Sequence, residues 1–200
     1  MQEAKDIASV LKAGELPAPI NIVQTNYVGP SLGEDSIESG SFSMFLGVIL
    51  VLLFILIYYK SFGIIANIAL IMNIIIVFAV LYTMNAVLTL PGIAGLLLTV
   101  GISVDANVII FERIREELKL KNTLYASITN GYKKAFTTIL DANITTLLTA
   151  FVLSFIGSGP IKGFATTLSV GIVCSMFTAI FLTKTIFITL LNNNIFKKYI

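Results

Sequence analysis

Five long stretches of this 200-residue chain are almost free of charge, and they constrain its fold more than any other feature. They cover residues 42–59, 64–84, 91–111, 137–156 and 163–183. A helix needs roughly 20 apolar residues to cross the hydrocarbon core of a bilayer. The composition agrees, because 56% of the residues are hydrophobic and 12% are charged, which excludes an ordinary soluble domain. The sequence therefore predicts an all-α membrane protein with five transmembrane helices.

The positions of Lys and Arg predict how these helices are oriented. Because the number of spans is odd, the two termini lie on opposite sides of the membrane. With the N-terminus outside, ten basic residues face the cytoplasm: Lys60, Arg113, Arg115, Lys119, Lys121, Lys133, Lys134, Lys184, Lys197 and Lys198. Only Lys5, Lys12 and Lys162 then face outward. We therefore expect an extracytoplasmic N-terminus and a cytoplasmic tail at residues 188–200.

Residues 1–40 precede the first span and carry their own pattern. A short helix is expected at residues 6–13 and a strand at residues 20–28, between prolines and glycines. One helix and one strand cannot bury a core. We interpret them as a short α/β remnant, the end of an extracytoplasmic domain whose remaining strands lie elsewhere, and the chain as a fragment.

Between the third and fourth spans, residues 112–136 are first charged and then amphipathic. This segment is predicted to lie on the cytoplasmic surface of a five-helix domain that covers residues 41–187. Two interpretations stay open for it. It either enforces topology through its basic residues or contacts a cytoplasmic partner.

Asp105 and Asp141 are the only charged residues inside the five spans. A carboxylate in hydrocarbon costs roughly 2.5–3.5 kcal/mol on insertion scales, so such residues usually serve a function. Asp105 lies roughly 9 Å and Asp141 roughly 6 Å from the cytoplasmic ends of their spans, at 1.5 Å per residue. Both begin an Asp-Ala-Asn triplet, which includes Asn107 in the first case. The two carboxylates are therefore expected at similar depth on antiparallel helices.

Small and polar residues form stripes around these carboxylates. One face of the third span has a three-and-four spacing of residues that allow close helix packing: Gly92, Gly95, Thr99, Ser103 and Ala106. Asp105 flanks that face, with Gly101 one turn away, so it is expected to face protein. Thr138, Thr145 and Thr149 line up with Asp141 as a polar path or as hydrogen-bonding partners for another helix. Plain helix packing is the favoured explanation of these stripes.

No basic residue lies inside any span, so a countercharge for Asp105 would have to come from another chain. Asp105 is predicted to bind and release protons, with Asp141 and Asn107 as supporting residues. The chain has no His and a single Cys, and its net charge is only +2. We therefore expect no catalytic residue, no metal, no cofactor and no nucleic-acid partner.

Three segments resemble the SecD branch of the SecD/SecF protein-export family. The run LPGIAGLLLTVGISVDANVIIFERIREELK, residues 90–119, is similar to its fourth transmembrane segment and the cytoplasmic helix that follows. LKAGELPAPINIVQTNYVGPSLGEDSIESG, residues 11–40, resembles the end of its extracytoplasmic domain. DANITTLLTAFVLSFIGSGPIKGFATTLSVGI, residues 141–172, resembles its fifth span, a hairpin and the start of its sixth span. The sister subunit SecF typically has Asn-Asp in place of the pattern at residues 104–107.

This resemblance implies half of a helix bundle of the resistance-nodulation-division superfamily, in the bacterial inner membrane. It implies SecF, the SecYEG channel and a translocating preprotein as partners, and export driven by the proton gradient. The acidic residue of the family's fourth span, matched by Asp105, would carry protons with an arginine from SecF. The family's first span and most of its extracytoplasmic domain have no counterpart here.

Three other readings remain. The chain could be half of another proton-driven transporter of the same superfamily, for efflux or lipid export. Two aspartates at similar depth would also suit an intramembrane aspartyl protease, although the residues before Asp105 and Asp141 do not match such proteases. A passive scaffold beside the channel would tolerate the loss of the Asp105 carboxylate.

Overall fold

The computed structural model describes residues 30–192, with side chains from residue 37 to residue 191. Its elements are α2 (Pro30–Tyr59), α3 (Ser61–Thr83), α4 (Leu90–Lys119), α5 (Leu124–Ile156), α6 (Pro160–Phe177), the π-helical segment η1 (Thr178–Leu182) and α7 (Thr183–Asn192). From residue 34 onward the described residues make up one compact unit, and the contacts described below lie within it. The helix and the strand predicted before residue 30 lie outside the described residues.

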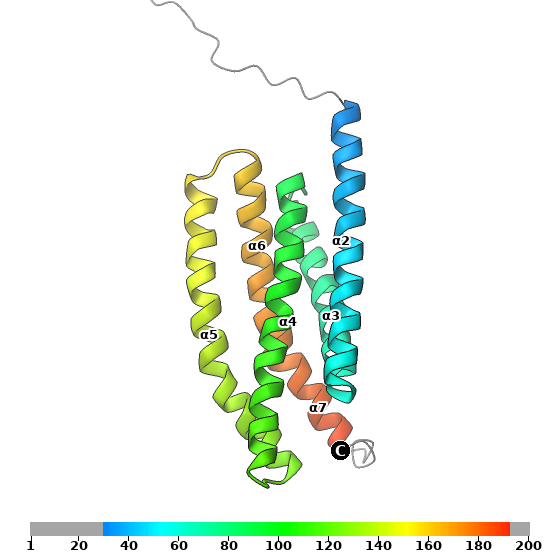
Figure 1. Cartoon of the computed structure of the whole chain (residues 1–200). Helices are drawn as coiled ribbons and strands as arrows, with labels where there is room; N and C mark the ends of the chain where they lie inside the picture. The colour runs from blue at the N-terminus through cyan, green and yellow to red at the C-terminus, as the bar shows by residue number, and fades with distance from the viewer. Residues whose placement is uncertain (1–29, 193–200) are drawn as a thin grey trace, which may run out of the picture. The chain divides into compact units, whose positions relative to one another are not determined.

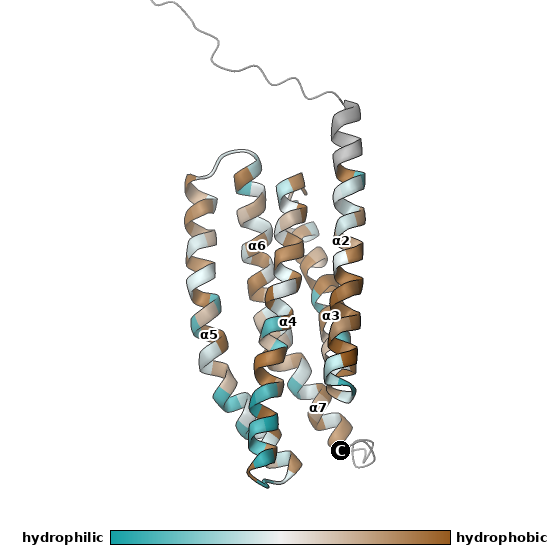
Figure 2. Cartoon of the chain, viewed as in Figure 1, coloured by the Kyte–Doolittle hydropathy of each residue, from teal (hydrophilic) through white to brown (hydrophobic). Residues whose placement is uncertain are grey.

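Within the described part of the chain, five helices are long and apolar enough to cross a membrane, which confirms the predicted fold class. Figure 1 shows these helices, and Figure 2 shows that hydrophilic residues gather where α4 and α5 meet. The helices extend past the predicted spans. α4 continues to Lys119 and α5 begins at Leu124, so residues 112–136 form the tip of a helical hairpin. The last helix likewise runs on to Asn192, into the predicted tail.

Local sequence explains where the helices begin. Thr89 caps α4 by accepting a hydrogen bond from the backbone N–H of Gly92, and Pro91 occupies the first turn, where its missing N–H costs nothing. Thr123 caps α5 in the same way. α6 begins after Gly159, whose φ of 51° lies in the left-handed region that glycine adopts without strain.

α4 is the central helix of the described unit. It packs against both α5 and α6, and α5 also packs against α6. At the hairpin end, Phe111 is fully buried and its ring lies 5.4 Å from that of Tyr59 and 5.9 Å from that of Phe187. These contacts join α2, α4 and α7 into the main apolar core, which lies nearer the hairpin than the opposite end.

α2 is far less enclosed than α4. Only 6% of the residues in its most apolar stretch are buried, against 56% for α4. Large side chains such as Phe54 and Ile57 are exposed. In a membrane protein, lipid covers such residues at no cost in free energy. The exposed apolar surface therefore needs no further explanation, and the exposed polar residues are the informative ones.

Candidate functional site

The two Asp-Ala-Asn triplets are placed in the same way on α4 and α5. Asn107 and Asn143 point inward and are 2% and 6% exposed, whereas Asp105 and Asp141 are exposed at the surface of the bundle. Each Asn side chain donates a hydrogen bond to a backbone carbonyl one turn earlier, at 3.1 Å and 2.8 Å. In each triplet the amide thus belongs to the packed interior and the carboxylate to the outer face.

The two carboxylates lie at similar heights above the hairpin. Gly131 on α5 approaches α4 so closely that an added Cβ would lie 2.9 Å from the backbone nitrogen of Ile114. Asp105 is nine residues from Ile114 and Asp141 is ten residues from Gly131, hence about 14 Å and about 15 Å along their helices at 1.5 Å per residue. The geometry agrees with the matched depth expected from the sequence.

Neither carboxylate has a partner within the described residues 37–191. All three ion pairs found there lie at the hairpin end, and none involves Asp105 or Asp141. No described residue covers Asp105, so the expectation that it faces protein stays a prediction about a neighbouring chain. One turn before Asp105, Gly101 borders open space, since an added Cβ would meet no atom within 4 Å. The outer face of α4 leaves room for another polypeptide to approach Asp105 closely.

The threonines that align with Asp141 already have hydrogen-bond acceptors on their own helix. The hydroxyls of Thr145 and Thr149 donate to carbonyls four residues earlier, at 3.0 Å and 3.1 Å. Both side chains are exposed, as is Thr138. A threonine bonded in this way can face lipid without an unsatisfied donor, so the stripe does not require a water path.

The small residues of α4 lie on its inward face, where Gly92, Gly95 and Thr99 pack against α6. Gly92, Gly95, Thr99, Ser103 and Ala106 are all buried. A Cβ on Gly95 would lie 2.6 Å from the Thr167 hydroxyl oxygen, and a Cβ on Gly171 would overlap the side chain of Thr99. We call this contact between α4 and α6 the small-residue seam. It accounts for Gly92, Gly95 and Thr99 by close packing alone.

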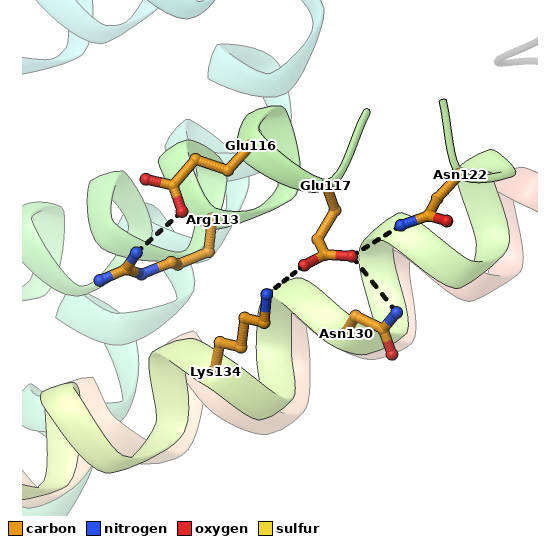
Figure 3. Close-up of polar contacts among 6 residues, drawn as sticks. All are labelled: Arg113, Glu116, Glu117, Asn122, Asn130 and Lys134. Carbon is orange, nitrogen blue, oxygen red and sulfur yellow. Dashed lines mark hydrogen bonds and ion pairs between the residues drawn. The ribbon is translucent and has the colours of Figure 1, made fainter. Parts of the chain in front are cut away.

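The hairpin tip holds a polar cluster that sequence reasoning missed. Glu117 is 3% exposed, and its carboxylate accepts hydrogen bonds from Lys134 at 2.5 Å, Asn122 at 2.9 Å and Asn130 at 3.3 Å (Figure 3). We call these four residues the hairpin clamp. Glu116 and Glu117 are adjacent in the sequence, and nothing in the sequence indicates that Glu117 is the one that is buried.

The hydrogen bond from Lys134, with those from Asn130 and Asn122, lowers the pKa of Glu117 below its ordinary value, and this outweighs the opposing effect of burial. Glu117 lies outside the apolar stretch of α4, which ends at Phe111. A carboxyl with a lowered pKa stabilises the fold above its ordinary pKa and loses that contribution as the pH falls through its pKa in the folded state. The Glu117 carboxylate therefore remains charged at neutral pH.

The described residues hold no cluster of His, Cys, Asp or Glu that would bind a metal ion. The chemistry that the outer face supports is proton binding, because two carboxylates without cations lie inside helices that cross the membrane.

Comparisons with known proteins agree with this arrangement. Residues 10–193 match the family described as protein export membrane protein SecD/SecF, C-terminal. The chain is 54% identical to protein translocase subunit SecD of Calditerrivibrio nitroreducens over 99% of its own length, and 57% identical to that of Desulfurispirillum indicum over 94%. It spans 38% and 36% of these two relatives.

A solved structure has the same fold. The crystal structure of SecDF from Thermus thermophilus, described as a translocon-associated membrane protein, superposes with a TM-score of 0.82 at 38% identity. The match covers 96% of this chain and 27% of that one. The helices described above thus correspond to one part of a larger membrane protein.

Proposed function

Because the chain belongs to the SecD/SecF family of protein-export membrane proteins, we propose that it is the membrane portion of a SecD-type subunit that uses the proton gradient to assist preprotein translocation. In this proposal Asp105 binds and releases the proton. The proposal includes the bacterial inner membrane as location, with the N-terminus extracytoplasmic and the C-terminus cytoplasmic. One proton crossing the membrane supplies about 2.3 kcal/mol per 100 mV.

The observation that carries this proposal is the unpaired, exposed position of Asp105 inside a transmembrane helix. A charged group facing lipid is costly, so the exposed carboxylate supports a second chain that covers it. The open space at Gly101 would let a neighbouring helix come close. We propose that SecF is this chain and that it supplies the arginine that pairs with Asp105, beside the SecYEG channel.

Asp141 and Asn107 have different places in this proposal. Asp141 shares the height of Asp105 and is also exposed, so we propose it as a second polar group along the proton path. Asn107 is buried and its amide bonds to the Ser103 carbonyl. It supports the path by shaping α4 from inside, and it does not face the same side as the carboxylates.

The test is preprotein export in cells whose only SecD is the full-length protein with Asp105→Asn. Asn has nearly the same size but does not ionise, so export should be lost while protein level and SecF association stay normal. Asp105→Glu is the matched control, because it keeps a carboxylate and should retain part of the activity. Undiminished export with Asp105→Asn would overturn the proton assignment and leave the scaffold reading.

A further inference from the structure

Glu117 differs from every other acidic residue of the described chain in being buried at the cytoplasmic hairpin while bound to three side chains. Its side chain is 4% exposed, whereas that of its partner Lys134 is 57% exposed. Figure 3 shows the carboxylate extending from α4 toward α5, where Asn130 and Lys134 meet it. The interaction therefore joins two helices through a buried carboxylate whose partners Lys134, Asn122 and Asn130 are themselves exposed.

Glu116 provides an internal comparison. It pairs with Arg113 at 2.8 Å, three residues away on the same helix, and both side chains are about half exposed, at 54% and 41%. An exposed pair within one helix contributes little and holds no other element in place. The two neighbouring glutamates thus separate a surface ion pair from a link between helices.

The hairpin clamp lies beside the closest approach of α4 and α5. At Gly131 the backbones touch, since an added Cβ would lie 3.0 Å from the Cα atom of Ile114. Such contact fixes the distance between the helices but leaves rotation about the contact less restricted. Three hydrogen bonds to one carboxylate, one turn away from this contact, restrict that rotation.

Asp105 and Asp141 lie on the same side of the contact between Gly131 and Ile114, farther along α4 and α5. Each lies about 14–15 Å from the contact, so a change in the angle between the helices at the hairpin moves the two carboxylates relative to each other. Their spacing from a partner chain depends on the same angle. The two exposed carboxylates are therefore connected mechanically through the clamp.

We propose that Glu117 is a positioning residue: through the hairpin clamp it fixes the relative orientation of α4 and α5, and so holds Asp105 and Asp141 in the arrangement that proton coupling requires. The functional half of this inference rests on the function proposed above. Its structural half is independent of that function, because whether the clamp fixes the angle between α4 and α5 does not depend on the role of Asp105.

The structural half is tested by distance measurements between spin labels in the purified full-length complex in lipid nanodiscs, with Cys174 replaced by Ser. Labels at Leu98 on α4 and Leu148 on α5 occupy exposed positions at nearly equal height above the hairpin. Glu117→Gln and Lys134→Met should broaden the distance distribution. Glu116→Gln and Lys134→Arg should leave it narrow, because the first lies outside the clamp and the second keeps its cation.

A charge exchange separates the clamp from a general loss of folding. In the double variant Glu117→Lys with Lys134→Glu the ion pair is reversed, and the amide groups of Asn122 and Asn130 can turn their oxygens toward the new ammonium. The distribution should become narrow again, although each single reversal broadens it. Broad distributions in the double variant would mean that the pair has no orienting role.

The functional half is tested by the part of preprotein export that a protonophore abolishes, measured per assembled complex in membrane vesicles. Glu117→Gln should reduce this part about tenfold or more, because small misplacements of reacting groups have large effects. The charge exchange should restore the proton-dependent export, and Lys134→Arg alone should retain it. A merely structural role would lower the amount of complex and not the proton-dependent export of each complex.

The outcomes are distinct. An unchanged distance distribution in Glu117→Gln overturns the clamp. A broadened distribution with normal proton-dependent export shows a clamp without a positioning role, which also overturns the inference. Normal export in Asp105→Asn would instead reject the proposed function, and the distance measurements would still decide whether Glu117 fixes the helices.

Discussion

On its inward face α4 places Gly92, Gly95 and Thr99 against α6, whereas on its outward face Asp105 is exposed and Gly101 borders open space. The inward face packs within this chain, since Gly95 meets Thr167 and Thr99 meets Gly171. The outward face carries a charge that no described residue compensates. One helix thus separates a face that is packed within the chain from a face that we propose a partner chain completes.

The largest effect is expected where the seam is tightest. Gly171→Leu would drive a side chain into Thr99, and overpacking of this kind costs about 1–3 kcal/mol or more. We expect a lower melting temperature and a reduced amount of folded protein in detergent. Gly101→Leu is the matched control on the open face and should not lower the melting temperature. Equal destabilisation by both variants would remove the distinction between the faces.

A smaller effect is expected from the second carboxylate. Asp141→Asn should leave the protein folded and reduce preprotein export only in part, because Asp141 lies on the outer helix α5 while α4 is central to the packing. Export rates per assembled complex, compared with those of Asp105→Asn, give the order of the two residues. A complete loss in Asp141→Asn with normal assembly would make it the principal proton-binding group.

The smallest effect is expected in the threonine stripe. Thr145→Val removes a hydroxyl that bonds only to the carbonyl of Asp141 on its own helix, so stability should change by no more than about 0.5 kcal/mol. Export should also stay at the original level. Thr149→Val offers the same comparison one turn farther along. A clear loss of export in either variant would show that the stripe acts as a polar path after all.

Charge-free apolar stretches were sufficient to predict five long apolar helices, and counting residues from the span ends placed the two carboxylates at similar height. Periodicity identified the small residues that share the inward face of α4. Periodicity was insufficient to predict which way Asp105 points, because a repeat identifies residues that share a face but not whether this chain or another covers that face. The hairpin clamp was missed for a different reason. Glu116 and Glu117 are adjacent in a charged run, and only the approach of α5 at Gly131 makes one of them buried.

The π-helical segment η1, between α6 and α7, shows a further limit of predictions from helical periodicity. Tyr132 on α5 donates a hydrogen bond of 2.6 Å to Thr183, just after the π-helical segment η1. Across this segment buried residues recur every four positions, at Ser175, Ala179, Thr183 and Phe187. In a regular α-helix Phe187 would be rotated by about 120° from Ser175, at 3.6 residues per turn. The wider turn at η1 takes up most of this rotation, because it holds about one residue more than a regular α-helix would. Inserting a further residue there would turn Phe187 by about 100° away from the core, whereas deleting one would leave it within about 20° of the Ser175 face.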